Sequence, residues 1–263
     1  MACDERDLIQ NCIIHFGVWE PEVSAQFEAS IRPGDVVVDI GANVGFFTLL
    51  AAHLTGSTGA VIAIEASPRI AALLQDNVDM NAPLPVSVRN VAVADKRGEV
   101  TIYDGPASNI GRTTILEGRG FDAGGTVPAL PIDEILSKAE AHSTAFIKID
   151  IEGAERPVLE HILAHLDRFP NLRHVLVEAS VEDGPDAWHA IFQRFTDAGF
   201  RAGAIENQYS YAWYLNWTRP QGLVPISRLP DTQTDVLFSR DPPAVMAEPV
   251  ATKRARTLQP IAG

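Results

Sequence analysis

Charged residues occupy alternate positions in FIKIDIEG, residues 146–153, and their types could support proton transfer or metal binding. In an extended strand, Lys148, Asp150 and Glu152 would point to the same side, because side chains two residues apart share a face. Glu178 ends the run HVLVEAS and would lie next to Asp150 on a neighbouring strand. A carboxylate beside an acceptor hydroxyl can take its proton, and carboxylates on adjacent strand ends can hold Mg²⁺. We therefore predict that Asp150, Lys148 and Glu152 are catalytic and that Asp150 and Glu178 form a candidate Mg²⁺ site.

Each of these residues also has a structural interpretation. Lys148 could form an ion pair with Asp150, and Glu152 could be a carboxylate stabilised by the dipole at a helix N-terminus. Glu155 continues the acidic string and could cap that helix or pair on it. His15 could approach the site from the N-terminal segment, although a packed or surface histidine is more common. Asp150 is therefore the strongest catalytic candidate.

A glycine-bracketed turn lies in VVVDIGANVGFFTLLAA, residues 36–52, between a strand-like run and a helical run. In an open α/β sheet, ligands bind beyond the carboxyl ends of the strands, where this turn would lie. A dinucleotide pyrophosphate needs the spacing G-x-G-x-x-G, but Asn43 takes the place of the middle glycine. A nucleoside that carries an amino acid instead of phosphates fits better, because its ammonium group could meet Asp39 or a carbonyl of the turn.

An acidic residue ends the next strand-like run, VIAIEASP, and could bind the ribose of such a ligand. Glu65 lies 26 positions after Asp39, and a carboxylate there can accept hydrogen bonds from both ribose hydroxyls. These features favour S-adenosylmethionine. An NAD-binding Rossmann oxidoreductase is an alternative. The chain lacks the second and third glycines of G-x-G-x-x-G, which argues against it. A non-catalytic nucleoside-binding module is another, but it would not need Asp150, Glu152 and Glu178 together.

Strand-like and helical runs alternate along most of the chain. Strands are expected at residues 35–40, 61–66, 86–93, 145–151, 173–179, 200–206 and 233–239. Helical patterns cover residues 44–54, 68–81, 154–167 and 185–199. Several strands are continuous apolar runs, which is typical of a mostly parallel sheet with helices on both faces. The alternation predicts a doubly wound α/β fold with seven strands.

Two segments interrupt this alternation. A long insertion between the third and fourth strands contains two strand signals, GEVTIYDG and GTVPALPI, which enclose a polar, glycine-rich loop. The segment 207–220 is aromatic and could line a substrate pocket, form a lid or make a homodimer contact. Its aromatic residues are Tyr209, Tyr211, Trp213, Tyr214 and Trp217. We divide the chain into an N-terminal helical cap segment, 1–30, a main domain, 31–240, and a flexible tail, 241–263.

The composition disfavours several classes of partner. The 263-residue chain has a formal net charge of −13 and a pI of about 4.9, whereas nucleic acids and anionic membranes attract concentrated Lys and Arg. The N-terminus lacks the features of a secretory signal, and no apolar stretch reaches membrane-spanning length. Cys3 and Cys12 are expected to be free thiols. We expect a soluble cytoplasmic protein that acts on a small molecule.

Four segments together resemble the FkbM family of S-adenosylmethionine-dependent methyltransferases: VVVDIGANVGFFTLLAA, VIAIEASP, VRNVAVADKRGEVTIY and FIKIDIEGAERPVLEH. The similarity covers about residues 17 to 205, and the string D-x-E-G-x-E within IKIDIEGAE is its most specific part. The resemblance implies a class I methyltransferase fold, which is Rossmann-like, with a final antiparallel strand. It also implies O-methylation of a hydroxyl, often on a sugar or a secondary metabolite.

The resemblance further implies which residues bind the cofactor. The segment from Asp39 to Gly45 would hold the methionine part, Glu65 would bind the ribose, and Ala66 would flank the adenine. The end of the third strand, 90–92, would lie near the adenine, and Glu20 belongs to a G-x-x-E-P-like string that the family often carries. The cofactor-binding residues expected in this way are Glu20, Asp39, Gly41, Ala42, Asn43, Gly45, Glu65, Ala66, Asn90, Val91, Ala92 and Asp150.

Overall fold

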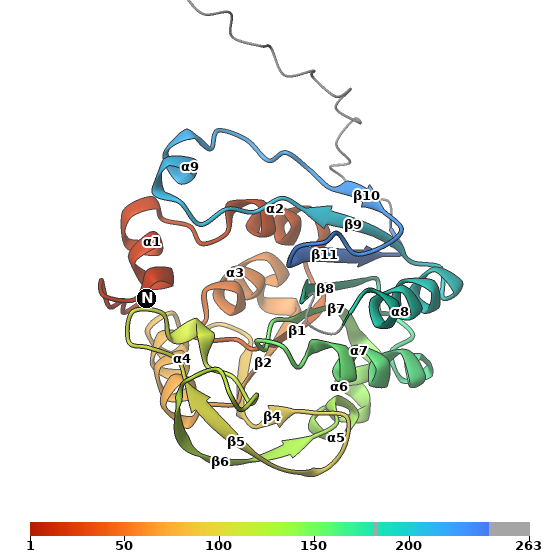
Figure 1. Cartoon of the computed structure of the whole chain (residues 1–263), viewed down its shortest axis with the longest axis horizontal. Coiled ribbons are helices and arrows are strands. Elements are labelled where there is room, and N and C mark those ends of the chain that lie inside the picture. Colours follow the sequence, from red (N-terminus) through yellow and green to blue (C-terminus); the bar gives the residue numbers. More distant parts are fainter. Residues whose placement is uncertain (181–183, 242–263) are drawn as a thin grey trace, which may run out of the picture.

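The computed structural model describes residues 1–180 and 184–241, and one large sheet crosses its centre (Figure 1). Eight strands of the described chain form this sheet, in the order β10-β9-β11-β8-β7-β1-β2-β3. The strands from β8 to β3 in this order pair in parallel, whereas β11 is antiparallel to β8 and β9, and β10 to β9. Their bounds are β1 (Val36–Ile40), β2 (Ala60–Glu65), β3 (Val86–Asn90), β7 (Thr144–Ile149), β8 (His174–Ala179), β9 (Arg201–Ile205), β10 (Val224–Ile226) and β11 (Thr234–Ser239).

The sheet confirms the predicted doubly wound fold, but the predicted number of seven strands is wrong. The eighth strand, β10, is only three residues long and contains Pro225, which argues against a strand in the sequence. Pro225 is tolerated because β10 lies at the edge of the sheet and pairs with β9 alone. The antiparallel β11 is the final strand that the family resemblance implies.

Alternate side chains of the central strands enter two separate hydrophobic cores, one on each face of the sheet. Val37 and Phe146 pack beneath α1, α2 and α3 on one face, whereas Val38 and Ile147 pack beneath α7 and α8 on the other. Burial on both faces explains why these strands are continuous apolar runs. The helix bounds are α1 (Leu8–Phe16), α2 (Pro21–Ser30), α3 (Phe46–Thr55), α4 (Pro68–Met80), α5 (Ile132–Ile135), α6 (Lys138–Ser143), α7 (Glu155–Ala164), α8 (Pro185–Asp197) and α9 (Tyr211–Asn216).

The predicted strand over residues 86–93 is divided between two sheets. β3 ends at Asn90 and pairs with β2, whereas β4 (Ala92–Val93) pairs with β6 (Asp122–Leu130) in a smaller sheet of order β4-β6-β5. β5 (Gly98–Asp104) is antiparallel to β6, so the two strand signals of the insertion form a hairpin. The segment 105–121 between β5 and β6, which we call the cap loop, extends from this hairpin toward the central sheet (Figure 1).

The ends of the chain are described in part. The expected cap segment, 1–30, contains α1 and α2, and both cysteines are free. Residues 242–263, most of the expected tail, lie outside the described residues, and the division into domains stays a prediction. Among the described helices, none is both long enough and apolar enough to cross a membrane.

Candidate active site

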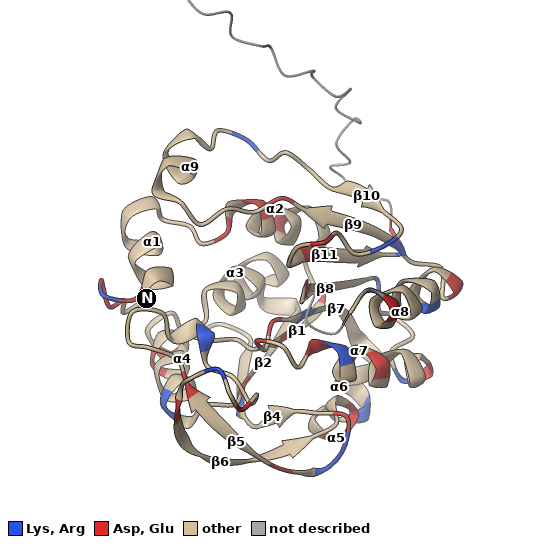
Figure 2. Cartoon of the chain, viewed as in Figure 1, with Lys and Arg blue, Asp and Glu red and all other residues tan. Residues whose placement is uncertain are grey.

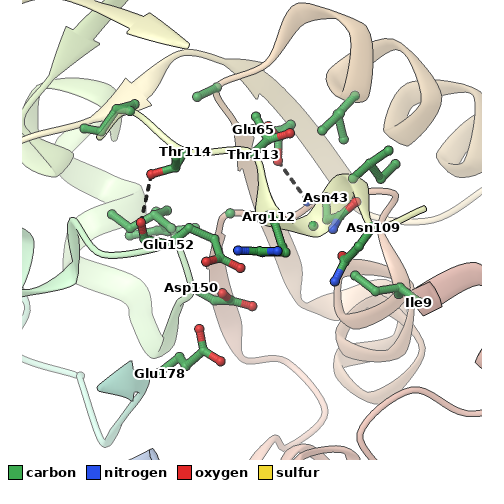
Figure 3. A pocket seen from close by; sticks show the side chains of 18 of the residues that line it. Ile9, Asn43, Glu65, Asn109, Arg112, Thr113, Thr114, Asp150, Glu152 and Glu178 are labelled. Carbon is green, nitrogen blue, oxygen red and sulfur yellow. Dashed lines mark hydrogen bonds between the residues drawn. The ribbon is translucent and has the colours of Figure 1, made fainter. Parts of the chain in front are cut away.

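A cavity of about 440 Å³, the first cavity, lies at the carboxyl ends of the central parallel strands (Figure 3). Parts of α1 and the cap loop also line it, through residues that include Ile9, Asn109 and Arg112. The expected site residues that line it are Glu20, Gly41, Asn43, Glu65, Ala66, Val91, Ala92, Asp150, Glu152 and Glu178. The expected site residues that do not line it are Asp39, Ala42, Gly45, Asn90 and Lys148.

The glycine loop, residues 41–45, brings the end of β1 against the ends of β2 and β7. Gly41 has a φ of +77°, and a Cβ on it would lie only 1.7 Å from the carbonyl oxygen of Asp150. The N–H groups of Gly41 and Ala42 both donate to the carbonyl of Ile64, at 2.9 and 3.1 Å. Glycine is therefore required here so that the loop can pass close to the backbone of the catalytic candidate.

The other small residues of the glycine loop pack behind it. Ala42 contacts Leu74 of α4 in a small core, and a Cβ on Gly45 would lie 2.6 Å from Leu74. Asn43 has a φ of +50° and faces the first cavity. Ala42 and Gly45 thus support the loop, while Gly41 and Asn43 form the wall that a ligand would meet.

Glu65 ends β2 with both carboxylate oxygens held by backbone donors. Oε2 accepts from the N–H of Asn43 at 3.0 Å, and Oε1 accepts from the N–H of Ser67 at 2.9 Å. Burial raises the pKa of Glu65 to about 7. Asn90 is exposed and does not line the first cavity, and its amide donates to the carbonyls of Glu65 and Ala66, at 2.8 Å each. Asn90 therefore positions the end of β2.

Lys148 joins two of the predicted acidic residues beneath the first cavity. Its Nζ lies 3.0 Å from Oδ2 of Asp150 and 3.8 Å from Oδ1 of Asp39, and its side chain is 3% exposed. Burial alone would lower the pKa of Lys148, but these two carboxylates raise it above its ordinary value. These distances show the ion pair between Lys148 and Asp150 that was considered above as the structural interpretation of Lys148.

Asp39 is fully buried under the glycine loop, away from the cavity wall. Its Oδ2 accepts from the hydroxyl of Thr48 at 2.6 Å, whereas its Oδ1 makes no hydrogen bond to the described residues. Burial raises the pKa of Asp39. Asp39 therefore has a supporting position, in which it holds the start of α3 and Lys148, and its contact with a ligand stays a prediction.

More carboxyl groups surround Asp150 than the sequence motifs identify. Asp235 of β11 is paired in register with Glu178 of β8, and Glu20 accepts from the hydroxyl of Tyr209 at 2.9 Å. Burial, followed by repulsion from Asp150, raises the pKa of Asp235 to about 7 and that of Glu178 to about 10. Burial likewise raises the pKa of Glu20 well above its usual value. These three groups therefore hold protons at neutral pH more readily than ordinary carboxylates.

Glu152 reaches the first cavity by a different geometry from the one its spacing predicts. β7 ends at Ile149, and Glu152 has a φ of +55°, so the alternation of a strand does not extend to it. Figure 3 nevertheless shows Asp150 and Glu152 pointing into the same cavity. Arg119 of the cap loop lies 3.4 Å from the Glu152 carboxylate, and the Thr114 hydroxyl donates to its carbonyl at 2.8 Å. The cap loop thus fixes this turn.

Glu155 holds the same turn from the start of α7. Its carboxylate accepts from the N–H groups of Ile151 and Gly153, at 3.1 and 3.0 Å. Glu155 is 1% exposed, and burial raises its pKa to about 7. The glutamate therefore supports the turn that carries Asp150 rather than capping α7, whose N-cap Ala154 makes no side-chain hydrogen bond.

The aromatic segment packs mostly against the N-terminal helices. Tyr209 lines the first cavity, whereas the Tyr214 hydroxyl accepts from the N–H of Glu20, and Trp217 donates to Glu22. Tyr211 is exposed and lies against the ring of His15, which is itself exposed and outside the cavity. Only Tyr209 of this segment is placed to meet a ligand of the first cavity.

The predicted Mg²⁺ site is not supported. No group of three or more metal-ligating side chains that could hold an ion occurs within residues 1–180 and 184–241. Oδ2 of Asp150 already accepts from the Lys148 ammonium, and burial raises the pKa of Glu178 well above its ordinary value. The pair that sequence spacing brings together therefore offers a poor set of ligands to a hard cation.

We expect the protein to be less stable at pH 8 than at pH 5.5. Burial raises the pKa of Glu65, Glu152 and Asp235 to about 7, whereas such groups titrate near about pH 4 in an unfolded chain. Between these values the folded chain binds more protons, so the free energy of unfolding falls as pH rises through this window. Scanning calorimetry from pH 5 to 8 should show a falling Tm, with a shallower slope for Glu65→Gln. A Tm that rises across this window would contradict the burial of these acids.

The sequence and the fold match those of known methyltransferases. Residues 39–202 match the model of the methyltransferase FkbM domain. The 31-O-demethyl-FK506 methyltransferase FkbM of Streptomyces tacrolimicus is 29% identical over 182 residues, which is 59% of this chain and 68% of that protein. A solved methyltransferase FkbM of Methylobacillus flagellatus KT shares the fold, with a TM-score of 0.50 and 17% identity, over 88% of this chain.

The family match covers most of the residues that line the first cavity, but not those from α1, the segment before α2 and the chain after β9. This chain spans only 52% of the length of the Methylobacillus structure, and the likeness to that structure shows the fold alone. The family model, by contrast, covers more than half of this chain, including the glycine loop, Glu65 and Asp150. The chain therefore belongs to the FkbM family of S-adenosylmethionine-dependent methyltransferases.

Proposed function

We propose that this chain methylates a hydroxyl group of a sugar or a secondary metabolite. The observation that carries this proposal is the place of Asp150: it lines the first cavity, directly beside the glycine loop, and Lys148 holds its carboxylate. A hydroxyl nucleophile has to lose its proton, and a carboxylate so placed can accept it. The name of the Streptomyces relative gives an O-demethyl compound as the substrate of that protein, which supports the proposal.

The residues of the first cavity fit S-adenosylmethionine. The backbone donors at Glu65 fix its carboxylate, and the remaining lone pairs can accept from two ribose hydroxyls. Ala66, Val91 and Ala92 provide an apolar wall for the adenine ring. Gly41 and Asn43 provide the loop wall that the methionine part would meet, and the absence of a Cβ on Gly41 lets this wall lie against Asp150.

The chain's own residues would act on the acceptor. When bound, S-adenosylmethionine supplies a methyl group whose bond to sulfur breaks, with the electron pair left on sulfur, as the acceptor oxygen forms the new bond. Asp150 takes the proton of that oxygen, and the ammonium of Lys148 keeps the Asp150 carboxylate oriented. Glu152 is the second candidate base, because it lines the same cavity and burial raises its pKa to about 7. Glu20 closes the wall beside Tyr209.

Glu65→Ala is expected to weaken the binding of S-adenosylhomocysteine, the demethylated cofactor, by about 1.5–3 kcal/mol, the range for hydrogen bonds to a charged group. The loss corresponds to about a 10- to 150-fold rise in Kd, which isothermal titration calorimetry can measure. Glu99→Ala is the matched control, because Glu99 is an exposed glutamate outside the first cavity. An unchanged Kd for Glu65→Ala would mean that this carboxylate does not bind the ribose.

Methyl transfer is expected to persist after exhaustive treatment with EDTA. The positive charge beside Asp150 comes from Lys148, a buried ammonium whose pKa is raised, so proton transfer needs no added cation. Initial rates measured with EDTA, and then with restored Mg²⁺, should agree within about twofold, because a metal that lowers the acceptor's pKa would contribute several kcal/mol. A large loss that Mg²⁺ alone restores would reinstate Asp150 and Glu178 as metal ligands.

The proposal is tested by finding the acceptor in cells. Deletion of the gene should cause a metabolite to accumulate that is one CH₂ lighter than the product in the parent strain. Purified protein with methyl-labelled cofactor should convert this metabolite, and NMR should place the label on oxygen. Label on nitrogen or carbon would contradict O-methylation while leaving the membership of the family intact.

A further inference from the structure

A second cavity adjoins the first beyond Glu178. It has a volume of about 560 Å³ and lies against β9, β10 and β11, on the side of the sheet where the antiparallel strands gather. Glu178, Tyr209 and Gln233 line both cavities and so form their common boundary. Figure 3 shows Glu178 close to Asp150 at that end of the first cavity. A molecule in the second cavity would therefore extend toward the proposed base.

The walls of the second cavity contain acidic and neutral polar groups without a compensating cation. Its carboxyl groups are those of Glu178, Glu206 and Asp235, and Asn207 and Gln233 contribute amides. No Lys, Arg or His occurs among the described residues that line it. The first cavity differs, since Arg112 and Arg119 contribute to its wall. An anionic group would find no cation to pair with in the second cavity, whereas hydroxyl and amino groups would meet carboxyl and amide groups that form hydrogen bonds.

Asn207 shows that this wall is built for a polar ligand. Both the oxygen and the nitrogen of its side chain are buried, and neither makes a hydrogen bond of ordinary geometry to the described residues. The nearby ionisable group is Asp235. Burial and Asp150 raise the pKa of its carboxyl group, whereas Lys148 and then the amide of Asn207 lower it. A buried amide whose hydrogen bonds are incomplete costs free energy, so a ligand that completes them would be favoured in the second cavity.

We propose, resting on the function proposed above, that the second cavity binds the acceptor and selects hydroxylated molecules that carry no anionic group. The Asn207 amide donates to and accepts from the acceptor, and Gln233 and Tyr209 guide its reacting hydroxyl past Glu178 to Asp150. Phosphorylated and carboxylated metabolites are rejected because the wall offers their charge no cation in exchange for the water that it loses on binding.

Asn207→Leu separates this role from a structural one. Leucine has nearly the shape of asparagine and removes two buried polar atoms that lack hydrogen bonds, so the Tm is expected to stay equal or rise. Binding of a polar ligand in the second cavity is expected to be lost. Asn216→Leu is the matched control, because Asn216 is exposed in the same segment and lines neither cavity.

Three probes of equal size test the selectivity: methyl glucoside, which is neutral, glucosamine, which is cationic, and glucuronate, which is anionic. Saturation-transfer NMR is recorded with each probe at millimolar concentration while S-adenosylhomocysteine fills the cofactor site. Wild type and Asn216→Leu should transfer saturation to the first two probes at least fivefold more strongly than to glucuronate. In Asn207→Leu, the signals of the first two probes should fall to the level of glucuronate.

The outcomes distinguish this inference from the proposed function. Equal signals for glucuronate, signals that survive in Asn207→Leu, or no signal from any probe would overturn the acceptor cavity. A fall in Tm for Asn207→Leu would show that the amide is structural and would also overturn it. Calorimetry with S-adenosylhomocysteine on the same samples reports on the cofactor site separately, and only its failure would count against the methyltransferase function itself.

Discussion

Asp150→Asn is expected to lower kcat by about 10²- to 10⁴-fold, the range that a positioned general base contributes. The substitution keeps the shape of the side chain and one hydrogen-bond acceptor for Lys148, but it removes the carboxylate that takes the proton. The Kd for S-adenosylhomocysteine should change by no more than about threefold, because the carboxylate acts on the acceptor after the cofactor is bound. Steady-state kinetics with the acceptor identified in cells, together with calorimetry, measure both quantities.

Glu152→Gln is the comparison for this variant. Glu152 lines the same cavity, but its carboxylate faces Arg119 and its pKa is raised to about 7 by burial. Glu152→Gln should therefore lower kcat by a smaller factor than Asp150→Asn. If Asp150→Asn lost cofactor affinity in proportion to kcat, Asp150 would belong to the cofactor site or to the fold. If Glu152→Gln were the more damaging change, Glu152 would be the base.

Gly41→Ala is expected to destabilise the fold and to abolish cofactor binding together. The new Cβ would lie 1.7 Å from the carbonyl oxygen of Asp150, in a backbone conformation with φ of +77°. The left-handed backbone costs about 1–2 kcal/mol for alanine, and forced separation of packed groups costs about 1–3 kcal/mol more. Thermal denaturation should therefore show a Tm about 5–15 °C lower. In the fraction of Gly41→Ala protein that still folds, the glycine loop would be displaced from β7.

Gly199→Ala isolates the effect of the clash. Gly199 has a similar φ, +87°, but a Cβ on it would meet no atom within 4 Å. This control carries the conformational cost alone, so its Tm should fall much less and its cofactor affinity should stay at the wild-type level. Equal losses in the two variants would show that backbone conformation, and not the approach to Asp150, makes Gly41 necessary.

The central sheet and the wall of the first cavity formed by the ends of β1 and β2 could be predicted because the signals are local. The strand, glycine turn and helix around Gly41 lie within one short segment, and Glu65 ends the next strand along the chain. Because these groups are close in sequence, their relative positions follow from local structure and do not depend on the rest of the fold. The β3–β4 region shows the limit, because the break between Asn90 and Ala92 depends on pairing with β6, far along the chain.

The surroundings of Asp150 could be predicted only in part. Asp235, Tyr209 and Arg119 reach the site from β11, the segment after β9 and the cap loop, and nothing in their local sequence relates them to Asp150. One available signal was the acidic residue inside the apolar run TDVLFS, which is unusual in a strand buried on both faces. Asp39 illustrates the converse, since its motif position is clear but its side chain supports the loop from beneath.

Titration of the purified protein with S-adenosylhomocysteine and with NAD, by isothermal calorimetry, is the most direct test of the first cavity as a cofactor site. The position of Glu65 at the end of β2, and Asn43 in place of a second glycine, favour the nucleoside that carries an amino acid. We expect S-adenosylhomocysteine to bind at one site with a Kd in the micromolar range, about −8 kcal/mol, and NAD to give no measurable heat. Equal affinity for NAD, or none for S-adenosylhomocysteine, would contradict this assignment.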